Sequence, residues 1–203
     1  MQRCSISAVC GYKFGLVYPG IGWLIFRERA DLAEDLVFYE NYLGKTDATF
    51  TLNFSTGSAM VLAQYYNFVR LGHDGYRFVM QIMQENTRTL VERVASTGRF
   101  RLVGDEGAEQ LPLVAFQLAE EKDYDEFDVA SQLSAERGWM VPAYTLPPDA
   151  DHVKIMRALV KLTLGHSLVT TLADDIVQAC ETLDSKGGLH EIDRQRVKTG
   201  TGY

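Results

Sequence analysis

The chain has 203 residues, of which 46% are hydrophobic, so it can bury one large core and a smaller second one. Its formal net charge of −7 argues against nucleic acid or an anionic membrane as a general partner, because phosphate-rich surfaces repel an acidic protein. The cysteines Cys4, Cys10 and Cys180 are too few and too scattered for a disulfide framework, and they favour a reduced, cytoplasmic setting.

The first predicted elements are a hairpin and two helices. Residues 4–9 and 21–27 have the pattern of strands, and the loop 11–20 between them ends in a Pro-Gly turn. We expect this hairpin to be part of a larger sheet. Residues 57–71 and 75–96 have helical periodicity, and Gly98 ends the second helix. Residues 1–25 form neither a signal-peptide core nor a spanning segment.

The rest of the chain alternates short strands with helices. We expect strands at 99–104, 112–118, 139–144 and 152–161, and helices at 125–137 and 165–184. This order predicts a small α+β domain at 99–185, with an antiparallel sheet covered by helices on one face. We expect the domain boundary before it to lie near 72–98, where a long helix at 73–98 connects the two parts. Residues 186–203 are rich in Gly, Lys and Arg and are predicted to be a disordered tail.

Lys13 is the first candidate for chemistry, since it lies on the turn after the first strand between Gly11 and Gly15. A lysine amine can capture a carbonyl group, and flanking glycines allow a flat ligand to approach the backbone closely. Most lysines that follow a glycine are solvated turn residues, so this spacing alone is weak evidence.

The residues around Lys13 carry a more specific signal. The segment GYKFGLVYPGIGWLIFR occupies 11–27, NYLG 41–44, TFTLNFS 49–55, AQYYNFVRL 63–71 and RGWMVPAYTLPP 137–148. Together they resemble the glutamate decarboxylase family of pyridoxal phosphate enzymes, and the resemblance extends over residues 4 to 180.

The resemblance implies an α/β fold of the aspartate aminotransferase type (PLP fold type I). In that family the cofactor-binding lysine lies past the middle of the polypeptide, so we expect this chain to be the C-terminal portion of such an enzyme. Residues 1–72 would then be the end of the large cofactor domain. The implied cofactor is pyridoxal 5′-phosphate, the implied substrate is glutamate, and the implied assembly is a homodimer or larger homo-oligomer with shared active sites.

The resemblance also assigns roles to single residues. It makes Lys13 the Schiff-base lysine and matches Tyr42 to a mobile-loop tyrosine that delivers a proton in a neighbouring active site. The alternative for Tyr42 is an ordinary loop aromatic. Phe54 and Ser55 match the segment that reaches the cofactor phosphate of the partner subunit, although Ser55 is equally suited to cap the following helix.

Arg157 matches the arginine that binds the α-carboxylate of the substrate, because a guanidinium holds a carboxylate through two parallel hydrogen bonds. The alternative is an edge-strand arginine that extends to solvent.

The chain departs from the family pattern beside the lysine. Tyr12 stands where family members carry a histidine that helps to bind the phosphate, and a phenol donates a hydrogen bond but carries no positive charge. Thr56, Met60 and Leu162 also replace a usually basic residue, a usual glutamine and a common acidic residue. These changes indicate relaxed constraint.

Other motifs are weaker. The four histidines lack the spacing of a zinc site, so no metal is expected. The acidic run 120–126 could suggest a cation site, but its position before a helix favours capping of that helix. Plant members of the family have a calmodulin-binding tail. The basic tail of this chain lacks the apolar anchors of a calmodulin target helix, so calmodulin is not an expected partner.

Two functions from different classes follow. The chain is either the C-terminal part of a glutamate decarboxylase that forms 4-aminobutanoate and carbon dioxide, or a non-catalytic remnant that pairs with complete subunits. The first half of the enzyme, which builds most of the side-chain pocket, has no counterpart here, so another acidic amino acid remains open as substrate.

Overall fold

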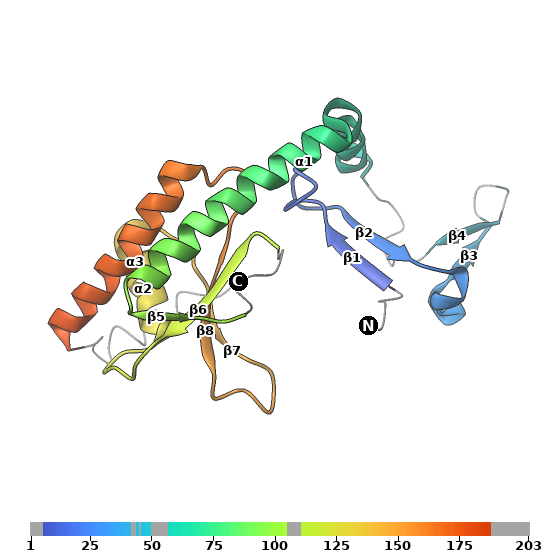
Figure 1. The fold of residues 1–203 in the computed structure, drawn as a ribbon. Coiled ribbons are helices and arrows are strands. Elements are labelled where there is room, and N and C mark those ends of the chain that lie inside the picture. Colours follow the sequence, from blue (N-terminus) through green and yellow to red (C-terminus); the bar gives the residue numbers. More distant parts are fainter. Residues whose placement is uncertain (1–5, 42–43, 45, 50–56, 105–110, 188–203) are drawn as a thin grey trace. The chain divides into compact units, whose positions relative to one another are not determined.

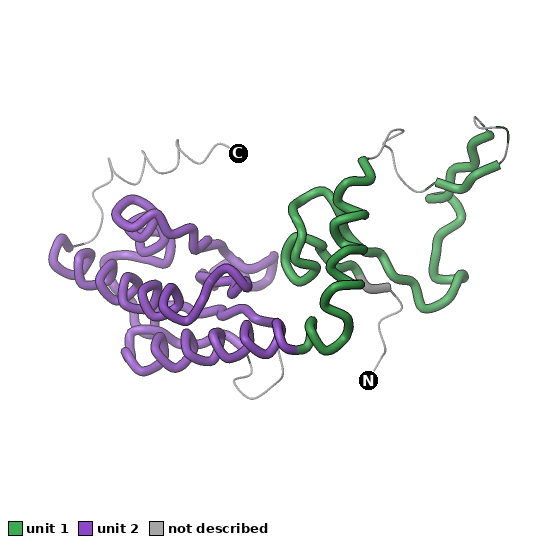
Figure 2. Tube along the Cα trace, turned by 90° about the horizontal axis from the view of Figure 1, so that it is seen from above, with its two compact units in different colours: residues 1–77 green, residues 78–203 purple. Residues whose placement is uncertain are grey.

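The structure is a computed structural model that describes residues 6–41, 44, 46–49, 57–104 and 111–187. The chain divides into two compact units, residues 1–77 and 78–203 (Figure 2). We call them unit 1 and unit 2 and describe each by itself. The predicted roles of Tyr42, Phe54 and Ser55 and the predicted disorder of the tail beyond residue 187 fall outside the described residues.

Unit 1 begins with the predicted hairpin. Strand β1 (Ile6–Cys10) pairs antiparallel with β2 (Gly22–Phe26), with Cys10 opposite Gly22 beside the connecting loop (Figure 1). Both strands were expected from the sequence. A second antiparallel pair, β3 (Phe38–Glu40) with β4 (Asp47–Thr49), was not expected, because three residues are too few to show a period.

Two short 3₁₀ turns lie between these strand pairs. They are η1 (Arg29–Asp31) and η2 (Glu34–Leu36), and neither was predicted. At the first turn, the side chain of Asp31 accepts a hydrogen bond from the backbone amide of Glu28 at 3.2 Å. Such local side-chain bonds stabilise a turn without leaving a periodic signal in the sequence.

Helix α1 (Ala59–Ser96) runs through both predicted helices and bends at Gly72. Gly72 has φ 57° and ψ −168°, a left-handed backbone conformation that glycine adopts far more easily than other residues. The expected break at 72–74 is therefore a single-residue kink. The boundary between the two units along the chain falls inside this helix, between Arg77 and Phe78.

Unit 2 contains the predicted antiparallel sheet. Its strands are β5 (Phe100–Leu102), β6 (Leu113–Leu118), β7 (Ala143–Thr145) and β8 (Lys154–Leu159), in the spatial order β5-β6-β8-β7. Helices α2 (Glu126–Arg137) and α3 (His166–Lys186) complete the unit (Figure 1).

The strand expected at 139–144 begins four residues later, at Ala143. The backbone amide of Trp139 donates to the carbonyl of Leu133 at 3.4 Å and so closes the C-terminus of α2. The side chain of Val141 is buried in the core, and pairing begins only at Ala143. Residues 139–142 therefore follow the end of α2 and precede the strand.

One continuous hydrophobic core lies between the helices and one face of this sheet. Leu90 and Val94 of α1 pack there with Phe116 of β6, Met156 of β8 and Ile176 of α3. The rings of Phe100 and Phe116 meet edge to face at 5.2 Å. The second half of α1 thus belongs to the core of unit 2, while the finer division into 73–98 and 99–185 stays a prediction.

Asp125, in the acidic run before α2, caps this helix, as expected. The Asp125 carboxylate accepts hydrogen bonds from the backbone amides of Phe127 and Asp128, at 3.0 and 3.1 Å. The backbone amide of Asp125 in turn donates to the Asp128 carboxylate, which completes a capping box. None of the described helices combines the length and apolarity that a membrane crossing needs.

Candidate active site

The turn that carries Lys13 connects the two strands of the first hairpin. The backbone amide of Gly11 donates to the carbonyl of Ile21 at 3.0 Å, and the amide of Val17 donates to the carbonyl of Gly11 at 3.4 Å. Lys13 is half-buried, and its Nζ lies 5.2 Å from the centre of the Tyr12 ring. No ion pair among the described residues includes Lys13, so its amine is not committed to a carboxylate there.

Both glycines beside Lys13 are required by packing within the protein. A Cβ atom on Gly11 would lie 2.6 Å from Ile21 Cγ2, and one on Gly15 would collide with Gln64 Oε1 and lie 2.9 Å from Gly11 Cα. Their missing side chains leave room for Ile21 and for Gln64 of α1. The interpretation that these glycines open the backbone to a flat ligand stays a prediction.

Three polar side chains of α1 bind the end of this turn. Gln64 Nε2 donates to the carbonyl of Gly15 at 2.8 Å, and the Tyr76 hydroxyl donates to the same carbonyl at 3.2 Å. Asn67 Nδ2 donates to the carbonyl of Leu16 at 2.9 Å. Leu16 has φ 59°, a left-handed conformation that costs a non-glycine residue about 1–3 kcal/mol, so these bonds hold the turn in a conformation it would not keep alone.

Tyr76 also belongs to a group of packed aromatic rings. The ring of Phe68 lies 5.6 Å from those of Trp23 and Tyr76, centre to centre. Burial raises the pKa of Tyr76, and the hydrogen bond with Gln64 offsets part of this rise. Tyr76 therefore remains a neutral hydrogen-bond donor at physiological pH.

Arg157 lies in unit 2, in the middle of β8. It is exposed, although Met156 and Ala158 on either side of it are buried, so its side chain lies on the opposite face of the sheet from the core. Its guanidinium carbon lies 5.5 Å from the centre of the Tyr144 ring, and its backbone amide donates to the carbonyl of Pro142 at 3.0 Å. None of the ion pairs among the described residues involves Arg157.

The predicted site residues that the structure describes belong to both units. Lys13 and Tyr12 share one turn of unit 1, whereas Arg157 belongs to unit 2 and is described there by itself. Sequence reasoning missed Gln64, Asn67 and Tyr76. Polar residues at positions 64 and 67, three apart on one helix face, are a signal that could have drawn attention to the first two.

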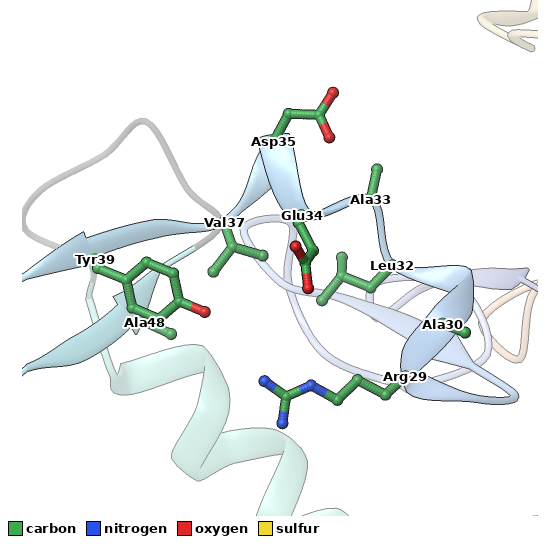
Figure 3. A pocket seen from close by; sticks show the side chains of 9 residues that line it. All are labelled: Arg29, Ala30, Leu32, Ala33, Glu34, Asp35, Val37, Tyr39 and Ala48. Atoms are coloured by element: carbon green, nitrogen blue, oxygen red, sulfur yellow. The ribbon is translucent and has the colours of Figure 1, made fainter.

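Unit 1 also has a hollow that does not include the Lys13 turn. It lies around the two 3₁₀ turns and the β3–β4 pair, and its lining residues are Arg29, Ala30, Leu32, Ala33, Glu34, Asp35, Val37, Tyr39 and Ala48. Figure 3 shows the carboxylate of Asp35 pointing away from the others. We assign no chemistry to this hollow, because none of its lining residues belongs to the predicted site.

Comparison with known proteins gives one consistent answer. Residues 3–119 match the pyridoxal-dependent decarboxylase conserved domain. A glutamate decarboxylase of Petunia hybrida is 44% identical over 177 residues, which cover 87% of this chain. The solved structure of a Lactobacillus brevis glutamate decarboxylase superposes with a TM-score of 0.75 at 36% identity, and the match covers 87% of this chain and 40% of that one.

A sphingosine-1-phosphate lyase structure from Burkholderia pseudomallei has a TM-score of 0.66 at 17% identity, covering 95% of this chain and 40% of that one, and shows the fold alone. The expected α/β fold of PLP fold type I is thereby confirmed. The chain spans 35% of the length of the Petunia relative. The domain match covers more than half of the chain, so the chain belongs to the pyridoxal-dependent decarboxylase family, in which its relatives are glutamate decarboxylases.

Proposed function

We propose that this chain forms the C-terminal part of a pyridoxal phosphate-dependent glutamate decarboxylase, which converts L-glutamate to 4-aminobutanoate and carbon dioxide. The observation that carries the proposal is the Lys13 amine, which has no carboxylate partner among the described residues and lies on a turn bound by three side chains of α1. The glutamate decarboxylase relatives support the choice of substrate.

Lys13 holds the cofactor covalently in this proposal. Its amine would be the group that holds the aldehyde of pyridoxal phosphate. Bound there, the cofactor supplies an electron sink for the charge that remains on the substrate after loss of carbon dioxide. The residues present fit this role, because no described carboxylate pairs with the amine and its turn is fixed by hydrogen bonds to α1.

Arg157 binds the α-carboxylate of the substrate. Its exposed guanidinium has the geometry for two parallel hydrogen bonds to a carboxylate, and the neighbouring ring of Tyr144 restricts where it can lie. Such a contact orients the bond to be broken relative to the cofactor ring. Replacing the guanidinium by an ammonium would lose this two-point contact, so arginine and lysine are not equivalent at this position.

Tyr12, Phe54 and Ser55 contribute to cofactor binding, and Tyr42 delivers the proton that replaces the lost carboxyl group. The support for these four roles is the likeness of sequence alone. The Tyr12 phenol can donate one hydrogen bond to a phosphate but adds no charge, so we expect weaker retention of the cofactor than in a relative with histidine at this position.

We further propose a homo-oligomer in the cytoplasm, with active sites shared between subunits. The resemblance supports the oligomer, and the sparse cysteines support a reducing compartment. The described part of unit 1 exposes many apolar side chains, as a surface covered by further polypeptide would.

A chimera tests the proposal. The segment of the Petunia hybrida enzyme that matches this chain is replaced by the chain, and the product is incubated with pyridoxal phosphate and reduced with borohydride. We expect the cofactor mass on the peptide that contains Lys13, together with glutamate-dependent release of carbon dioxide. Lys13→Ala should abolish both, whereas Lys161→Ala, at an exposed position of unit 2, should retain both. A label on another lysine of the chain, or none, would refute the proposal.

The alternative is a non-catalytic chain that pairs with complete subunits, and the exposed apolar surface of unit 1 favours it. The chain would then co-purify with a tagged intact relative and change its rate of glutamate turnover. Failure to co-purify eliminates this alternative.

A further inference from the structure

Gln64 is buried completely, with an exposed fraction of 0%, although glutamine is rarely found inside a protein. Its Nε2 donates to the carbonyl of Gly15 at 2.8 Å and to the Tyr76 hydroxyl oxygen at 3.0 Å. The Tyr76 hydroxyl in turn donates to the carbonyl of Gly15. Two donors from one helix therefore converge on a single carbonyl, two residues after Lys13.

This convergence depends on the kink in α1. Gln64 and Tyr76 are 12 residues apart, a separation that spans about 18 Å along a straight helix. Their side chains nevertheless meet at 3.0 Å, because the helix bends at Gly72 between them. No atom of the described residues lies within 4 Å of a Cβ built on Gly72, so the glycine there is required by its left-handed φ of 57°.

The orientation of the Gln64 amide is also fixed. Exchange of its oxygen and nitrogen would place the oxygen against the carbonyl of Gly15, two acceptors facing each other. In the observed orientation, Oε1 is buried without a hydrogen-bond partner among the described residues. A buried polar atom left unpaired destabilises the fold, and the bonds that Nε2 makes to the turn offset that loss.

We propose that Gln64, Asn67 and Tyr76, the anchor residues, are positioning residues for Lys13. They hold the carbonyls of Gly15 and Leu16, and with them the left-handed conformation of Leu16, so that the turn presents the Lys13 amine in one place. The inference rests on the proposed role of Lys13, and it adds that the helix kink at Gly72 is part of the same device.

Two measurements on the full 203-residue chain test this. The first is hydrogen exchange, without cofactor, at the backbone amides of Gly11 and Val17, which are bonded within the turn. The second is the labelling of Lys13 by pyridoxal phosphate and borohydride between pH 6 and pH 9. Lys122 and Lys161 in the same sample serve as internal references.

Four variants are compared with the native chain. Gln64→Met keeps the length of the side chain and removes its donor, and Tyr76→Phe removes one hydroxyl. Gly72→Ala leaves all three anchor residues in place but disfavours the kink. Gln132→Met is the matched control, because Gln132 is a buried glutamine of α2 in unit 2.

We expect Gln64→Met to raise exchange at Gly11 and Val17 by about tenfold or more, the scale of a lost buried hydrogen bond. It should also lower the ratio of Lys13 to reference labelling and change the pH profile of Lys13. Tyr76→Phe and Gly72→Ala should act in the same direction, and Gln132→Met should change neither measurement. A purely structural role would alter exchange and leave the pH profile of Lys13 as in the native chain, which would overturn the proposal.

The outcomes separate this inference from the proposed function. If the native chain labels at Lys13 and all three unit 1 variants exchange and label as it does, the anchor role is wrong and the proposed function stands. If Lys13 of the native chain reacts no better than the reference lysines, its proposed covalent role fails. If hydrogen exchange in the variants is then also the same as in the native chain, the proposal for the anchor residues is overturned as well. If Gln64→Met does not fold, Tyr76→Phe and Gly72→Ala decide the question.

Discussion

The two units bury their apolar side chains to very different extents. In unit 2, Phe116, Met156 and Leu133 are among the side chains that lie wholly inside one cluster. In unit 1, Trp23, Leu24 and Ile25 are consecutive in β2 and all exposed, so both faces of the hairpin present apolar surface. A strand that is apolar on both faces is typical of the interior of a sheet covered on both sides. Unit 2 therefore has the core of an independent domain, and unit 1 has the pattern of a part that needs further polypeptide to cover it.

Separating the units should have the largest effect. We expect residues 78–187 to unfold in one cooperative thermal transition, because the whole hydrophobic core lies among them. Residues 1–77 should show no such transition and should bind a hydrophobic dye, because their apolar side chains stay in water. Circular dichroism melts of the two fragments check this. A cooperative melt of residues 1–77 would show that unit 1 has a sufficient core of its own.

Truncation of single leucines sharpens the comparison. Leu133→Ala in the core of unit 2 should lower the free energy of unfolding by about 2–5 kcal/mol, because it leaves a cavity. The matched change Leu62→Ala, on α1 in unit 1, removes a side chain that is 63% exposed and should change it by about 0.5 kcal/mol or less. Urea denaturation of the two variants measures both values. Equal effects would mean that Leu62 is covered in solution.

The cap of α2 should have a smaller effect that depends on pH. Burial by itself would raise the pKa of Asp125, but the hydrogen bonds from Lys154 and from the backbone amides of Asp128 and Phe127 outweigh it and lower the pKa below the usual range. Asp125→Ala should therefore cost about 1 kcal/mol of stability at neutral pH.

A lowered pKa in the folded state fixes the sign of this dependence. The contribution of the Asp125 carboxylate is fully present above the unfolded pKa of about 4, and it disappears as the pH falls through the lower, folded pKa. The stability difference between the native chain and Asp125→Ala should thus shrink below about pH 4. Urea denaturation from pH 3 to pH 7 checks this, with Asp174→Ala as an exposed control. A constant difference would exclude the carboxylate as its source.

The smallest effect concerns reactivity and leaves stability unchanged. Cys180 is buried in unit 2, and burial raises the pKa of its thiol to about 11. Cys10 is half-buried at the end of β1 in unit 1. A thiol reagent at pH 8 should modify Cys10 in the native chain and reach Cys180 only when urea unfolds unit 2. Mass spectrometry of the labelled peptides checks the order, and early labelling of Cys180 would mean that unit 2 opens as readily as unit 1.

Local signals were enough for much of this fold. The hairpin strands, the helix start at Asp125 and the turn that carries Lys13 depend on residues within a few positions of each other, so periodicity and turn chemistry revealed them. The segments at 11–27, 63–71 and 137–148 also carried the family, because such strings of matches are specific. The short β3–β4 pair escaped prediction, since each strand is only three residues long.

Tertiary structure alone decided how the Lys13 turn is held. The bond between Gln64 and Gly15 joins residues 49 positions apart, and no periodic pattern encodes a contact at that distance. Likewise, Gly72 reads in the sequence as a helix end, whereas in three dimensions it brings Tyr76 back to the carbonyl that Gln64 already binds. Short-range propensities set where the helices and strands form. The packing of one helix against one turn determines which of its polar side chains supports the lysine.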